Sequence, residues 1–152
     1  MHNSFLLLLL LRFHRIQVNR AATAWLIRRF VDPQAEFLFV EPDQVAAIQA
    51  AQGALGFDAP GARYPHQDNR GRCSFEALVD ERCAQDAALQ DLARIIHGAD
   101  LKDLDAAPEC RGLLTISRGF PLVARDDHET MEKTAFLYDA LYASLKQRRA
   151  SA

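Results

Sequence analysis

The amino-acid sequence predicts an α-rich α+β fold, in which five to six helices pack around a small sheet. Apolar residues recur at helical spacing through most of the chain, whereas residues 36–40 have the aromatic and branched composition of a strand. Of the 152 residues, 49% are hydrophobic and 25% are charged, which is typical of a soluble domain with one continuous core. We therefore expect residues 1–152 to form a single domain, although residues 1–12 could be a disordered or non-native start.

Six segments carry the apolar spacing, the capping residues or the stop signals of a helix. Pro33 ends the first, because the residue before a proline is pushed out of the α region, and Gly53 ends the second. Ser74 and Asp86 are the expected N-caps of the third and fourth helices, and Gly98 is the expected end of the fourth. The predicted helices span residues 21–32, 42–52, 75–83, 87–97, 108–118 and 127–148.

Three further segments are predicted to be extended. The apolar run at residues 5–11 is too short to span a bilayer, which takes about 20 residues. No Lys or Arg precedes the run, as one would in a signal peptide, so we expect a buried strand or an extended start. Residues 16–18 are predicted to form a short extended segment, and the loop-rich stretch 56–72 is predicted to hold a short strand near Phe57.

The charge pattern restricts the classes of partner. A net charge of −2 gives no bulk attraction to nucleic acid or to an acidic membrane. Arg20, Arg28 and Arg29 are candidates for a local anion-binding face, because guanidinium groups bind oxyanions in a bidentate way. A solvated face is the alternative, since adjacent side chains on a helix point about 100° apart. The three cysteines fit no zinc or redox motif, so we expect reduced thiols in a cytoplasmic protein, with Cys83 and Cys110 buried.

The most informative polar group is His66, Cys73 and Glu76. Imidazole, thiolate and carboxylate all bind transition metals, and a glycine-containing turn can bring positions 66 and 73 together. A helix that begins at Ser74 would place Cys73 and Glu76 near its first turn, where the helix dipole lowers the pKa of a thiol. The structural alternative is a loop histidine, a buried cysteine and a glutamate in a capping interaction.

Two other groups could add metal ligands or an acid/base pair. His97 is followed by Asp100 and Asp103, and Asp127 and His128 stand at the start of the last predicted helix. Each group also has a structural explanation. A histidine complements the dipole at the carboxyl end of a helix, and acidic residues are favoured at an N-terminus without any function.

These segments together form a recognisable pattern. The Trp-Leu-Ile-Arg-Arg-Phe run at 25–30 and the Cys-Ser-Phe-Glu run at 73–76 resemble the domain found at the C-terminus of ChrB-type chromate-resistance proteins. The resemblance extends from residue 13 to residue 145. It implies a stand-alone, sensory or regulatory domain that binds a metal or another ligand and lacks the DNA-contacting N-terminal region. A metal- or thiol-dependent enzyme of chromate or oxidative-stress detoxification is the alternative, although the resemblance favours a domain that is not an enzyme.

The resemblance also selects the candidate site residues. We expect a transition-metal ion as cofactor, chromate or that metal as ligand, and a homodimer or a regulatory protein as partner. Direct DNA binding is not expected. The family pattern usually has aspartate where this chain has Asn19, whose amide oxygen can bind a cation but cannot act as a base. The predicted metal ligands are His66, Cys73, Glu76, Asp100, Asp127 and His128, and the predicted anion-binding residues are Arg20, Arg28 and Arg29.

Overall fold

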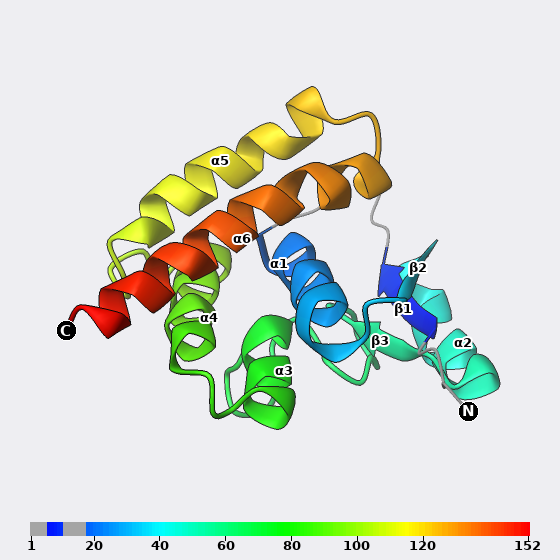
Figure 1. Cartoon of the computed structure of the whole chain (residues 1–152). Helices are drawn as coiled ribbons and strands as arrows, with labels where there is room; N and C mark the ends of the chain where they lie inside the picture. The colour runs from blue at the N-terminus through cyan, green and yellow to red at the C-terminus, as the bar shows by residue number, and fades with distance from the viewer. Residues whose placement is uncertain (1–5, 11–17) are drawn as a thin grey trace.

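The computed structural model describes residues 6–10 and 18–152, and in these residues six α-helices accompany a three-stranded sheet (Figure 1). The predicted α-rich α+β class is confirmed. No helix in this part of the chain combines the length and the apolar character needed to cross a membrane. The helices are α1 (Val18–Leu26), α2 (Val45–Gln52), α3 (Ser74–Arg82), α4 (Ala87–Asp100), α5 (Glu109–Val123) and α6 (Asp127–Ala150).

The sheet is parallel and has the order β2–β1–β3. The N-terminal apolar run supplies the central strand β1 (Leu6–Leu10), which pairs with β2 (Glu36–Val40) on one side and β3 (Leu55–Phe57) on the other. The strands predicted at residues 36–40 and near Phe57 are therefore confirmed. Figure 1 shows the sheet and α2 at one end of the molecule, and α5 and α6 at the other, with α1 between them.

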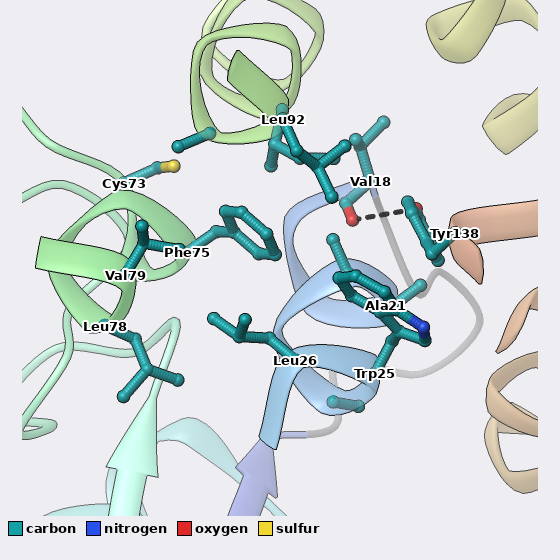
Figure 2. Close-up of a cluster of buried hydrophobic side chains, with 14 of the residues drawn as sticks. Val18, Ala21, Trp25, Leu26, Cys73, Phe75, Leu78, Val79, Leu92 and Tyr138 are labelled. Carbon is teal, nitrogen blue, oxygen red and sulfur yellow. Dashed lines mark hydrogen bonds between the residues drawn. The ribbon is translucent and has the colours of Figure 1, made fainter. Parts of the chain in front are cut away.

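Helix α1 forms the centre of the core. Arg20 is the only one of its residues that is not buried. Helices α3, α4 and α6 all pack against it, and Figure 2 shows Phe75 of α3, Leu92 of α4 and Tyr138 of α6 around its side chains. Tyr138 of α6 also donates a hydrogen bond from its hydroxyl to the Val18 carbonyl at 3.2 Å. With this packing the helix begins before Ala21, the start that the sequence pattern predicts.

The predicted boundaries of α1 and α5 are wrong at one end each. Helix α1 begins at Val18, not Ala21, because its buried stripe extends back to that residue. The extended segment predicted at residues 16–18 is therefore wrong at Val18, and residues 16 and 17 lie outside the described residues. Helix α5 continues past Arg118 to Val123, with Pro121 in its last turn.

Gly98 does not end α4, which continues to Asp100. An added Cβ at this glycine would lie 2.5 Å from the Cys110 Sγ and 2.6 Å from the Asp103 carbonyl oxygen. The glycine is therefore needed for close contact between α4 and the start of α5, and not for a left-handed helix end. Cys110 is fully buried, as expected, whereas Cys83 is partly exposed, which corrects the prediction for that thiol.

We expect Gly98→Ala to lower the free energy of unfolding by about 1–3 kcal/mol, because overpacking forces the neighbouring atoms apart. Urea denaturation monitored by circular dichroism measures this change. Gly112→Ala is the matched control, since no atom lies within 4 Å of its added Cβ. That control should raise stability by about 0.5–1 kcal/mol, the gain typical of alanine in a helix interior. Equal effects of the two substitutions would contradict the close contact.

Candidate functional site

Asn19, in the first turn of α1, joins two clusters of polar side chains. It is 0% exposed. Its Oδ1 accepts a hydrogen bond from the Phe75 backbone N–H at 3.1 Å, and its Nδ2 donates to Asp58 Oδ1 at 3.3 Å. Because Phe75 is the second residue of α3, Asn19 caps that helix from a neighbouring one. One buried amide therefore fixes the start of α3 and holds Asp58.

The first cluster is Cys73, Glu76 and His97, in which one ligand atom from each residue lies within 4.8 Å of the others. Cys73, and not Ser74 as predicted, is the N-cap of α3, and Glu76 occupies the first turn. Ser74 is buried and bonds to two backbone carbonyls instead. Glu76 Oε2 accepts from the Cys73 backbone N–H at 2.9 Å and lies 2.5 Å from His97 Nδ1 on α4. The cluster therefore joins the start of α3 to α4.

The Cys73 thiol is not activated. It is 0% exposed, and burial raises its pKa far above the ordinary value. The backbone N–H of Glu76 opposes this increase, but the charges of Glu76 and Asp100 add to it. The expectation that the helix dipole lowers this pKa is therefore wrong, because loss of hydration outweighs the dipole. The thiol is neutral, so it can become a ligand only if a metal ion displaces its proton, which is then released to solvent.

We expect Cys83 to react first when the folded protein is treated with a chromogenic disulfide reagent. Cys73 and Cys110 are both buried, so they should react only after unfolding. Mass spectrometry of the labelled peptides identifies the modified residue. Labelling of Cys73 before Cys83 would contradict the buried, neutral thiol.

A polar cleft of about 280 Å³ borders the first cluster. Glu76 and His97 line it and are only partly buried, so the cluster is open to solvent on this side. Asp80, Arg94 and Asp103 complete the polar rim. The opening gives an ion or small ligand access to Glu76 and His97, whereas Cys73 does not line the cleft.

The second cluster centres on Asp58, which directly follows β3. Its backbone has a φ of 58°, an uncommon value for a residue with a side chain. Its carboxylate accepts hydrogen bonds from Asn19 and Arg20, and its Oδ1 lies 2.7 Å from His66 Nδ1. On the other side, Asp100 Oδ2 lies 3.7 Å from the same nitrogen. His66 is thus placed between two carboxylates.

The charges of the second cluster are strongly coupled. Burial would raise the pKa of Asp58, but the hydrogen bonds and charges of His66 and Arg20 outweigh it and lower that pKa. Asp58 in turn raises the pKa of His66. Burial, reinforced by the charge of Asp58, raises the pKa of Asp100 to about 6. Asp100 is thus mostly ionised at pH 7 and takes up a proton as the pH falls through about 6.

The six predicted metal ligands do not converge on a single site in the structure. Cys73 lies with Glu76, and His66 lies with Asp100. Asp127 and His128 are in neither cluster. Both stand at the start of α6, where the His128 ring makes an edge contact with Phe39 at 4.4 Å between centroids.

Two residues of the clusters were not among the predicted ligands. His97 was noted in the sequence but left out of the predicted set. Asp58 was not selected from the sequence. The sequence feature that could have indicated a functional role is its position directly after the short strand near Phe57.

The three predicted anion-binding arginines do not share a site. Arg20 pairs with Asp58. Arg28 lies over the Phe37 ring, 4.7 Å from its centroid, and Arg29 pairs with Asp139 at 3.3 Å. A cleft of about 180 Å³ is lined by Arg28 and Arg29 but not by Arg20.

Comparison with known proteins places this chain in a family. Residues 12–145 match the family described as "ChrB, C-terminal domain". The chain is also 34% identical over 133 residues to Protein ChrB of Cupriavidus metallidurans (strain ATCC 43123 / DSM 2839 / NBRC 102507 / CH34). That alignment covers 87% of this chain and 39% of the relative, so the chain spans well under half of the relative's length. No solved structure matches the chain.

Proposed function

Because this chain belongs to the ChrB C-terminal domain family, which is linked to chromate resistance, we propose that it is a sensory domain whose signal is a bound transition-metal ion. The observation that carries the proposal is the convergence of Cys73, Glu76 and His97 within 4.8 Å. We infer that these three residues hold the ion. A partner protein or a second copy of the domain would respond to its presence.

The donor set limits the metals that fit. One sulfur, one oxygen and one nitrogen suit a borderline ion such as Zn²⁺, Co²⁺ or Fe²⁺ better than Mg²⁺ or Ca²⁺. Three protein ligands leave a coordination position open, and the cleft beside Glu76 and His97 gives it access to solvent. Chromate, or an oxyanion like it, could reach a bound ion through the same cleft.

The position of the cluster explains how binding could act as a signal. Cys73 and Glu76 belong to the start of α3, and His97 belongs to α4. An ion that binds all three would favour one packing of these two helices over others, and a partner could recognise that packing. A thiol-dependent enzyme is less well supported, because the neutral, buried Cys73 lacks the properties of a nucleophile.

A titration with Co²⁺ under anaerobic conditions tests the proposal. We expect one equivalent to bind with an absorption band from charge transfer between thiolate and cobalt. Cys73→Ser should abolish the band, and His97→Gln should weaken binding at least 10-fold, as is typical when one metal ligand or its support is lost.

Cys83→Ser is the matched control, because its thiol is in neither cluster. It should leave the titration unchanged. A band that survives in Cys73→Ser, or that is lost in Cys83→Ser, would reject Cys73 as the ligand.

A further inference from the structure

We propose that the cleft between α1 and α6 is half of a symmetric interface, and that it receives the Phe136 ring of a second copy of this chain. The proposal does not depend on the metal site proposed above. It rests on an exposed aromatic ring, on a cleft of matching size beside that ring, and on two unpaired charges of opposite sign.

The cleft, here called the Trp25 cleft, has a volume of about 180 Å³. It lies where α1 and the π-helical turn that follows it (Ile27–Val31) pack beside α6 (Figure 1). Trp25 and Met131 give it an apolar floor, since both line the cleft and each is 6% exposed. An apolar cavity of about 150 Å³ binds benzene, so a cleft of this size can hold one phenyl ring.

Phe136 protrudes from α6 next to this cleft. It is 80% exposed, so its burial in an interface would be favourable. It follows Glu132, which lines the cleft, by four residues, and side chains four residues apart lie on the same face of a helix. The ring does not line the cleft of its own chain. A single exposed apolar side chain is ordinary, but a ring beside an unfilled cleft of its own size indicates an interaction surface.

A ring and a matching cleft on one face are what a two-fold interface requires. Both subunits use the same patch in such an interface, so the contact between ring and cleft is made twice. Each ring would cover the apolar floor of the other copy's cleft, and both apolar surfaces would leave water together. This self-complementarity favours a second copy as the occupant over a peptide of another sequence.

The charges around the cleft favour the same occupant. Arg29, after α1, pairs with Asp139 of α6 at 3.3 Å. Arg28 and Glu132 line the same cleft, and neither has an ion-pair partner within the described part of the chain. A two-fold axis beside the cleft would bring Arg28 of each copy toward Glu132 of the other, so the two unpaired charges are complementary.

Sedimentation velocity of the metal-free protein over a range of concentrations tests the proposal. We expect a dimer with a dissociation constant on the order of micromolar, as for small interfaces. Phe136→Ala should weaken dimerisation at least 10-fold, the effect of truncating a buried aromatic anchor. Leu122→Ala is the matched control, because this side chain is 83% exposed and does not line the Trp25 cleft. It should dimerise like the wild type.

The fluorescence of Trp25 reports whether the ring enters the cleft, because this is the one tryptophan of the chain. Its emission should move to shorter wavelength as the wild type dimerises, and this dependence on concentration should be absent in Phe136→Ala.

Charge reversal tests the orientation of the two copies. Arg28→Glu and Glu132→Arg should each weaken dimerisation, because like charges would then meet across the axis. The double variant should restore it, since the signs are complementary again.

Several results would overturn the proposal. They are a wild type that stays monomeric at every concentration, unchanged dimerisation in Phe136→Ala, and loss of dimerisation in Leu122→Ala. A dimer that forms without any change in Trp25 emission would also overturn it. All four substituted side chains are exposed, so the variants should fold, and far-ultraviolet circular dichroism verifies this.

Discussion

Asp100→Asn is expected to stabilise the metal-free protein by about 2 kcal/mol at pH 8, and to change its stability little at pH 4. Burial and the charge of Asp58 raise the pKa of Asp100 to about 6 in the fold, from 3.8 for the unperturbed group. The folded protein therefore holds this proton more tightly than the unfolded chain does. The stability that the group contributes is fully present below about pH 4 and is lost as the pH rises through 6.

Urea denaturation of wild type and variant at pH 4 and pH 8 measures the effect. The shift of the Asp100 pKa from 3.8 to about 6 sets the upper limit of this gain, and it already includes the attraction between Asp100 and His66. Asp105→Asn, exposed at the surface, should change stability by less than about 0.5 kcal/mol at either pH. A marked loss of stability in Asp100→Asn at pH 8 would show that the carboxylate is well satisfied in the metal-free fold, contrary to our description.

Asn19→Asp is expected to have the opposite effect, lowering the stability of the metal-free protein by about 2–4 kcal/mol at pH 8. The substitution replaces the Nδ2 donor, 3.3 Å from Asp58 Oδ1, by a carboxylate oxygen. Two buried carboxylates would then face each other beside Asp100. Protonation removes the repulsion, so the loss should shrink as the pH falls toward 4.

Asn69→Asp, an exposed position in the loop before α3, is the matched control and should be as stable as the wild type at both pH values. Equal stability of Asn19→Asp and wild type at pH 8 would contradict the tight contact between positions 19 and 58.

Local signals in the sequence predicted most of the secondary structure. Gly53 ends α2 with a left-handed φ of 64°, and Asp86 caps α4 by accepting from the Leu89 N–H at 3.0 Å, both as expected. These features depend on residues close in the chain. The continuation of α4 past Gly98 does not depend on such local features. There Gly98 lies close to Cys110, a residue that only the folded packing brings near it.

The candidate site was predictable only where its residues are close together in the chain. Cys73 and Glu76 are three residues apart at a helix start, so their proximity follows from local geometry. His66 is close to Cys73 in the sequence. Its ring nevertheless contacts Asp58, which directly follows β3 and not the loop before α3. The pKa of Cys73 also depends on how completely the core covers it, and no spacing pattern contains that information.

X-ray absorption at the metal edge of the protein loaded with one equivalent of Zn²⁺ or Co²⁺ tests the central claim most directly. Binding at Cys73, Glu76 and His97 requires one sulfur ligand at about 2.3 Å, with nitrogen and oxygen ligands at about 2.0–2.2 Å. In Cys73→Ser the sulfur contribution should disappear, and in Cys83→Ser it should remain. A spectrum of the wild-type protein that shows only nitrogen and oxygen ligands would contradict the account.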